Sequence, residues 1–175
     1  LGIHSWEAAR LAAGAGPEAV RRLDAGEASV AFCAVRPPGH HALSSRAMGF
    51  CLLNNVAVAA AHLAERGERV VIVDYDAHHG NGTQHIFWND PRVFYISLHE
   101  WPQYPGTGAL SAMGAGPGHR TTMNFPLPSG ATGDVYRHAV DEVIVPALEA
   151  WGPTWMILSA GFDGHRLRPL AVLAE

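Results

Sequence analysis

The segment at residues 70–82, VVIVDYDAHHGNG, constrains the fold of this chain more than any other. Its first four residues are apolar and β-branched, which is typical of a strand buried on both faces of a parallel sheet. Asp74, Asp76 and His78 follow at intervals of two, so their side chains share one face while the chain stays extended. The glycines after them allow a tight turn. Because open α/β sheets bind ligands outside the carboxyl ends of their strands, this segment predicts a binding site there.

The composition indicates one globular domain. The chain has 175 residues, 48% of them hydrophobic, which is enough for a single core. Its net charge of -4 gives no basic surface, so we expect no direct nucleic-acid partner. Cys33 and Cys51 lie among apolar residues, which predicts two buried, reduced thiols. No membrane-spanning run or signal segment is visible, so we expect no membrane partner and a cytoplasmic location.

Alternating strand and helix patterns predict a single α/β domain with a parallel sheet over residues 1–175. The predicted strands cover residues 28–35, 70–73, 93–98, 121–125 and 154–159. The predicted helices cover residues 6–13, 18–25, 56–66, 83–88 and 134–150. Gly14, Gly16 and Pro17 separate the first two helices, and Pro146 is expected to kink the last. Either Asn54 or Asn55 is expected to cap the helix at 56–66, and the Gly-rich residues 109–118 are predicted to form a mobile loop.

A third acidic side chain follows another predicted strand. Asp163 comes after the strand at 154–159 as Asp76 and His78 come after theirs, so the three are expected to meet at one sheet edge. One such aspartate alone would more often cap a helix. Three protein ligands of this kind leave one coordination position open, which is the arrangement of catalytic zinc sites.

Two adjacent histidines lie on a second rigid loop. His40 and His41 follow two prolines that fix the backbone. A lone histidine is more often a structural hydrogen-bonding group, but a pair close to a metal suits a general base and acid. Asp74 is not needed as a metal ligand, and its carboxylate is expected to orient the ring of His40.

Six ordered motifs resemble those of the zinc-dependent histone deacetylase family, closest to its class II-like and bacterial acetylpolyamine amidohydrolase-related branch. They are RPPGHHA at 36–42, MGFC at 48–51, DYDAHHGNGTQ at 74–84, ISLH at 96–99, YPGTG at 104–108 and SAGFD at 159–163. The resemblance implies the three-layer arginase/deacetylase fold with one Zn²⁺ per chain. The implied zinc ligands are Asp76, His78 and Asp163.

The resemblance also implies roles for other residues. His41 would be the general base and acid, and Asp74 would support His40. Asn81 stands where many members of the family have an aspartate beside the second histidine, so we predict a lower pKa for His41. The residues implied to line the acyl-lysine tunnel or its mouth are Gly49, Phe50, His79, Tyr104 and Leu170. An inner K⁺ site is implied at the Ser97 hydroxyl and the carbonyls of Asp74, Asp76, His78 and Leu98.

The implied reaction is zinc-dependent hydrolysis of an acyl-amide to a free amine and a carboxylate. Its substrate would be an acylated lysine peptide or a small acylated amine such as an acetylated polyamine. Family domains are roughly twice this length, and the Gly-rich loop with the oxyanion-donating tyrosine has no counterpart here. We therefore expect a partial catalytic domain, incomplete at both ends. The alternatives are a binuclear manganese ureohydrolase of the same fold and a non-catalytic module that binds an acyl ligand or a metal; a homo-oligomer is compatible with either.

Overall fold

The computed structural model describes residues 2–165, which form helices and a parallel sheet. The α-helices are α1 (Ser5–Asp24), α2 (Asn55–Ala64), α3 (Asn81–Ile86), α4 (Gly133–Ala139) and α5 (Val145–Trp151). A π-helical turn, Val140–Ile144, joins α4 to α5, and a 3₁₀ turn covers Gly116–Gly118. The strands are β1 (Val70–Asp74), β2 (Val93–Glu100), β3 (Thr122–Leu127) and β4 (Trp155–Ser159).

The four strands form one sheet in the order β3-β2-β1-β4, and every neighbouring pair is parallel. Asp74, at the end of β1, is in register with Ser97 of β2 and Ser159 of β4. The carboxyl ends of the three strands therefore meet at one edge. This is the edge at which the sequence predicted a site.

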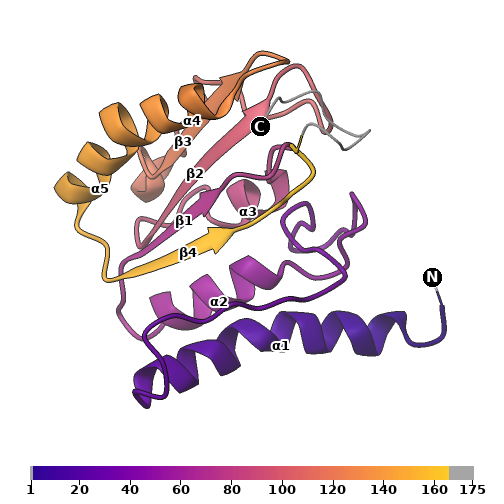
Figure 1. Ribbon diagram of the computed structural model, residues 1–175. Helices are drawn as coiled ribbons and strands as arrows, with labels where there is room; N and C mark the ends of the chain where they lie inside the picture. The colour runs from indigo at the N-terminus through magenta and orange to yellow at the C-terminus, as the bar shows by residue number, and fades with distance from the viewer. Residues whose placement is uncertain (1, 166–175) are drawn as a thin grey trace.

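Helices cover both faces of the sheet, which gives the predicted three layers (Figure 1). Side chains alternate along β1 and β2: Val70 and Ile72 pack toward α2, and Val71 packs toward the helices after β3. The same alternation along β2 places Tyr95 on the α2 side and Ile96 on the opposite side. Because both faces are covered, these two central strands are apolar at consecutive positions.

The first helix differs from its prediction. Residues 5–24 form one continuous helix in place of two short ones, although Gly14, Gly16 and Pro17 lie inside it. Its buried side includes Ala9, Ala12, Ala13 and Val20, and it packs along α2. Helix packing on this apolar side outweighs the poor helix propensity of the central residues.

The predicted strand at residues 28–35 is wrong. These residues form no strand, and the side chains of Val30 and Phe32 are 78% exposed. Cys33 lies in the same segment and is exposed, so the prediction of a buried thiol holds for Cys51 only. A β-branched run forms a strand only where a neighbour supplies hydrogen bonds, and sequence periodicity does not report that neighbour.

Residues 109–118 also differ from their prediction as a loop without defined structure. The backbone N–H of Ala115 donates to the carbonyl of Trp88, and that of Arg120 donates to Met113. The side chain of Asn124 on β3 donates to the carbonyl of Ala112. Hydrogen bonds to two neighbouring elements therefore hold this segment in place.

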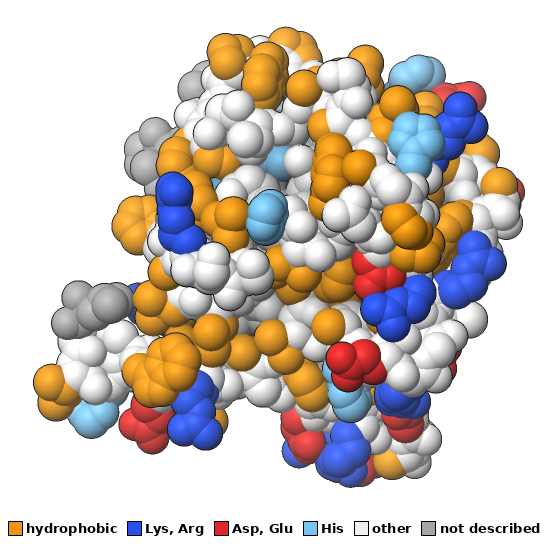
Figure 2. Space-filling view, turned by 180° about the vertical axis from the view of Figure 1, so that it is seen from behind, with side chains coloured by type: hydrophobic (Ala, Val, Ile, Leu, Met, Phe, Trp, Pro, Cys, Tyr) orange, Lys and Arg blue, Asp and Glu red, His pale blue; other side chains and the backbone are white. Residues whose placement is uncertain are grey.

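Hydrophobic side chains also lie at the surface. In the view from behind, a band of hydrophobic side chains runs across the molecule above α1. Charged side chains gather below this band (Figure 2). Large exposed side chains include Phe32, Met156, Leu158 and Phe162. Within residues 2–165, no helix is both long and apolar enough to cross a bilayer.

Candidate metal centre

Three side chains converge at the carboxyl end of the sheet. Asp76 and His78 lie on the turn after β1, and Asp163 lies after β4. Their nearest ligand atoms all fall within 4.8 Å of one another. His78 Nδ1 lies 2.7 Å from Asp163 Oδ2 and 3.2 Å from Asp76 Oδ1. The structure thus brings together the three residues that the sequence predicted as metal ligands.

Backbone amides orient both carboxylates. The N–H of Ala77 donates to Asp163 Oδ1 at 3.2 Å, and the N–H of His78 donates to Asp76 Oδ1 at 2.8 Å. The hydrogen bonds that Asp163 and Asp76 accept from His78 raise the pKa of His78 to about 10. Burial alone would raise the pKa of Asp163, but hydrogen bonds from His78 and Ala77 lower it. The cluster therefore holds one proton between these groups, and a cation bound to the same lone pairs would displace it.

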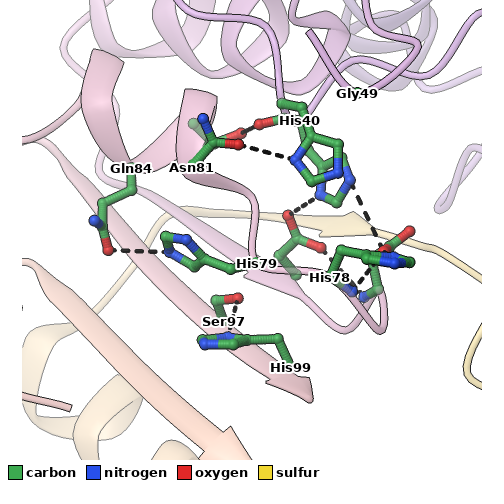
Figure 3. A network of polar contacts seen from close by, with 12 residues as sticks. His40, Gly49, His78, His79, Asn81, Gln84, Ser97 and His99 are labelled. Atoms are coloured by element: carbon green, nitrogen blue, oxygen red, sulfur yellow. Dashed lines mark hydrogen bonds and ion pairs between the residues drawn. The ribbon is translucent and has the colours of Figure 1, made fainter. Parts of the chain in front are cut away.

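His40 is buried beside a fully buried carboxylate. Its Nδ1 lies 3.0 Å from Asp74 Oδ2, and the hydroxyl of Tyr95 donates to the same oxygen at 3.3 Å (Figure 3). Burial alone would lower the pKa of His40, but the charge of Asp74 and its hydrogen bond raise it to about 9. His40 is therefore an imidazolium at neutral pH, held in orientation by Asp74.

His41, in contrast, is neutral. Its Nδ1 lies 2.9 Å from Asn81 Oδ1, which only accepts hydrogen bonds, so Nδ1 carries the hydrogen and Nε2 carries the lone pair. Burial, together with the positive charge of His40, lowers the pKa of His41 to about 4. The two adjacent rings, whose centroids are 4.0 Å apart, thus differ in charge. The pKa of His41 is thus below that of His40, but burial and the charge of His40 lower it, whereas the hydrogen bond with Asn81 raises it. The effect that the sequence predicted for Asn81 stays a prediction.

The loop of the two histidines is fixed by its backbone. The carbonyl of His40 accepts hydrogen bonds from the N–H groups of Gly82 and Thr83, at 3.0 and 3.1 Å. Asn54 caps α2 by accepting from Ala57, and its amide group donates to Ala42 at 3.1 Å. Sequence reasoning expected Asn54 only as a cap, because the contact with Ala42 depends on tertiary packing.

Gly49 and Tyr104 lie against the ring of His41. A Cβ atom on Gly49 would overlap the ring of His41, and its φ of +56° also favours glycine. The ring of Tyr104 stands edge-on to His41 with 5.1 Å between centroids, and Phe50 is 91% exposed. Gly49 and Tyr104 thus lie against His41, and the tunnel role of these residues stays a prediction.

His79 does not share this position. Its side chain is buried and turned toward Gln84, away from His78 (Figure 3). Its other ring nitrogen lies 2.7 Å from the hydroxyl of Thr107. The prediction that His79 lines a substrate tunnel is at odds with this buried position. Leu170, the remaining predicted tunnel residue, lies outside the described residues.

Ser97, predicted to contribute to a K⁺ site, lies next to Asp74 in the sheet register. Its hydroxyl lies 2.9 Å from His99 Nδ1, while His99 Nε2 lies 3.1 Å from the carbonyl of Gly108. A carbonyl only accepts, so Nε2 is protonated, and the Ser97 hydroxyl donates to Nδ1. The lone pairs of the Ser97 oxygen are therefore not used by His99.

Several known proteins of similar sequence carry the name deacetylase. The sequence profile described as the histone deacetylase domain matches residues 1–174. A probable deacetylase of Archaeoglobus fulgidus is 44% identical over 170 residues, which are 97% of this chain and 47% of that protein. Histone deacetylase 14, chloroplastic, of Arabidopsis thaliana is 44% identical over 171 residues, covering 93% of this chain and 40% of that protein.

Solved structures of the same kind superpose closely. The HD domain of HDA15 matches with a TM-score of 0.90 and 44% identity, over 95% of this chain and 48% of that one. Acetylpolyamine aminohydrolase from Burkholderia pseudomallei matches with a TM-score of 0.92 and 39% identity, over 99% and 51% respectively. The chain thus spans about half the length of these relatives. It has the arginase/deacetylase fold, and it belongs to the histone deacetylase family.

Proposed function

We propose that this chain contains the metal centre of a hydrolase that converts an acylated amine to a free amine and a carboxylate. The substrate class is acetyl-lysine in a protein or a small acetylated polyamine, as the names of the relatives suggest. The observation that carries the proposal is the cluster of Asp76, His78 and Asp163 beside a neutral His41. A family resemblance without this cluster would support the fold alone.

The donor set fits Zn²⁺. One imidazole nitrogen and two carboxylate oxygens are ligand types that zinc accepts, and three protein donors leave a position for water or substrate. Asp76, His78 and Asp163 would hold the ion, because their ligand atoms already converge and are oriented by hydrogen bonds. When bound, Zn²⁺ would supply a Lewis acid that polarises the amide carbonyl and lowers the pKa of water. A manganese pair would need further bridging carboxylates, and Asn81 is a neutral amide where another acid would help, which favours one ion.

His41 is suited to move the proton. Its Nε2 carries a lone pair, because Nδ1 donates to Asn81, so Nε2 would accept a proton from the attacking water. The same atom would then return that proton to the nitrogen of the leaving amine. His40 would remain protonated beside Asp74, and its positive charge would favour the negative charge that develops on the carbonyl oxygen.

Gly49, Phe50 and Tyr104 would form the wall along which the acyl chain reaches the centre. Gly49 and Tyr104 lie against His41, Phe50 follows Gly49 and is exposed, and all three side chains are small or aromatic. A K⁺ ion is proposed at Ser97 Oγ and the backbone carbonyls of Asp74, Asp76, His78 and Leu98. The register of Asp74 with Ser97 supports this placement. A cytoplasmic location stays a prediction, since Histone deacetylase 14 is chloroplastic by name.

The test combines metal analysis with an activity assay. We expect one Zn²⁺ per purified chain, and we expect Asp163→Ala to lose the ion and the hydrolysis of acetyl-lysine peptide and acetylputrescine. The control is Asp141→Ala, which removes an exposed carboxylate from the turn between α4 and α5 and should change neither quantity. Two manganese ions per chain would establish the ureohydrolase alternative. Binding of an acetylated peptide without turnover by the full-length protein would favour a non-catalytic module.

A further inference from the structure

Two buried histidines lie behind the metal centre and have no part in the chemistry proposed above. His79 and His99 are 1% and 0% exposed, and their ring centroids are 4.8 Å apart at a tilt of 50°. Figure 3 shows them on the Gln84 and Ser97 side of the site, apart from His40. A buried imidazole needs partners for both ring nitrogens, so the groups that these rings bind indicate their purpose.

Both rings bind the same short loop. His99 Nε2 donates to the carbonyl of Gly108 at 3.1 Å, and its Nδ1 accepts from Ser97. His79 Nδ1 lies 2.7 Å from the hydroxyl of Thr107. His79 Nε2 lies 3.2 Å from Gln84 Oε1, which accepts, so Nε2 is protonated and Nδ1 accepts from Thr107.

Gln84, the partner of His79 Nε2, is itself held by a hydrogen bond. Asn124 on β3 donates to Gln84 Oε1 at 2.8 Å, so the amide oxygen faces the ring in a defined orientation. The neutral state of His99 is also consistent with its two hydrogen bonds, because burial lowers its pKa to about 4. Thr107 and Gly108 are thus held at consecutive positions by two rings that the sheet and α3 keep in place.

The loop that these rings hold carries an aromatic side chain to the metal centre. Tyr104 lies three residues before Thr107, and its ring lies 5.1 Å from the ring of His41 and 6.3 Å from that of His78. Gly108 has a φ of +95°, and a Cβ atom there would overlap the rings of both His79 and His99. The main chain of the loop therefore lies directly against the two histidines.

We infer that His79 and His99 form an anchor that holds residues 104–108, the Tyr104 loop, so that the Tyr104 ring stays beside His41. Thr107 is then a positioning residue for the substrate wall of the proposed deacylase, and this role rests on that proposed function. The hydroxyl of Thr107 is the side-chain link between the loop and the anchor, and the carbonyl of Gly108 is the backbone link. The residue is otherwise at the surface, so its substitution leaves the core unchanged.

The experiment compares Thr107→Val with Thr107→Ser in the Zn²⁺-loaded chain. Valine keeps the shape of threonine and removes the hydroxyl, whereas serine keeps the hydroxyl. An edge-on aromatic ring shifts the proton resonances of its neighbour, so the ring signals of His41 report the position of Tyr104 by NMR. We expect Thr107→Val to move these signals toward their values in Tyr104→Leu, and Thr107→Ser to leave them as in the unsubstituted chain.

The kinetic readout is separate. We expect Thr107→Val to raise KM for acetyl-lysine peptide by roughly threefold to tenfold, the worth of one aromatic contact, with kcat changed less than KM. Gly108→Ala should have the same effects, because its Cβ atom would overlap both rings and displace the loop from the anchor. The inference is overturned if Thr107→Val leaves the His41 signals unchanged, or if Thr107→Ser alters them as much. The NMR comparison needs no turnover, so it tests the anchor whether or not the chain is active, whereas the metal and activity assays test the proposed function.

Discussion

Asn81 shows how one side chain sets the chemistry of its neighbour. Because its amide oxygen bears no charge, the contact with His41 Nδ1 orients the ring with little stabilisation of the imidazolium. We expect Asn81→Asp to raise the pKa of His41 by roughly one to three pH units, since a carboxylate in the same position favours the charged ring. An NMR titration of both histidines in the metal-free chain measures this shift.

The same titration tests the unsubstituted chain. His41, with its pKa lowered to about 4, should lose its proton well below His40, whose pKa is raised to about 9. Met48→Leu is a suitable control, because the Met48 sulfur accepts from the Asn81 amide and not from either histidine. If His41 were the more basic of the two, the assignment of His41 as the proton acceptor would be wrong.

Helix α1 contains two glycines that differ in their surroundings. A Cβ atom on Gly14 would meet no other atom within 4 Å, whereas one on Gly16 would lie 2.7 Å from the Cβ of Ala59 on α2. We therefore expect Gly14→Ala to raise the free energy of unfolding by about 0.5–1 kcal/mol through helix propensity. Gly16→Ala should lower it by about 1–3 kcal/mol, because the added methyl group overpacks the α1–α2 contact.

Urea unfolding of the two variants measures both effects against one reference. The pair is matched in chemistry and lies on the same helix, so a difference in sign would come from the packing on α2. Equal changes in the free energy of unfolding would show that α1 does not pack on α2 as described.

Sequence reasoning predicted well those elements whose own residues fit only one kind of structure. β1, β2 and β4 were predicted within two residues at each end, because β-branched runs of that length fit a strand buried on both faces. The meeting of Asp76, His78 and Asp163 followed from the parallel order of those strands. Local pattern and global fold agree at these positions.

The predictions that failed depended on partners far away in the chain. The glycines and proline of α1 indicate a break, but the packing against α2 overrides it. The segment at 28–35 has strand composition and no strand beside it within the described residues. His79 adjoins a predicted metal ligand, yet its side chain contacts Thr107, which is 28 residues away and gives no signal in a single sequence.

The domain as a whole should be most stable near pH 6.5 when it is free of metal. Below that value the unfolded chain binds more protons at the histidines whose pKa is lowered: His79 to about 3, His41 and His99 to about 4. Stability is therefore lost as the pH falls from 6.5 toward 4. Above 6.5 the folded chain binds more protons at His40 and His78, with pKa values of about 9 and about 10, so stability is lost as the pH rises toward them.

Urea unfolding in the presence of a chelator at pH 4.5, 6.5 and 8.5 measures this dependence. His99→Gln should reduce the loss of unfolding free energy between pH 6.5 and 4.5, because it removes one of the buried neutral rings. Zn²⁺ should reduce the loss of unfolding free energy between pH 6.5 and 8.5, since metal binding already requires the His78 proton to leave. A free energy of unfolding that rises steadily from pH 6.5 to 8.5 without metal would contradict the expected maximum.

The exposed apolar side chains predict self-association of the chain at high concentration. Phe32 is 78% exposed and Leu158 56%, and Leu158 lies on β4, whose outer edge has no strand beside it among residues 2–165. An apolar surface next to an unpaired strand is typical of an interface. We expect the double variant Phe32→Ser and Leu158→Ser to lower the mean mass in analytical ultracentrifugation. Leu110→Ser, at a similarly exposed loop position, should leave it unchanged.

The two hydrogen bonds that the carbonyl of His40 accepts have a consequence for measuring how the site opens. The amide protons of Gly82 and Thr83 lie under the loop of the two histidines, and each points at a residue some forty positions earlier. They exchange with deuterated solvent only when that loop lifts from the turn after β1. Their exchange rates therefore report how readily the centre opens, and the measurement needs no substrate and no bound ion.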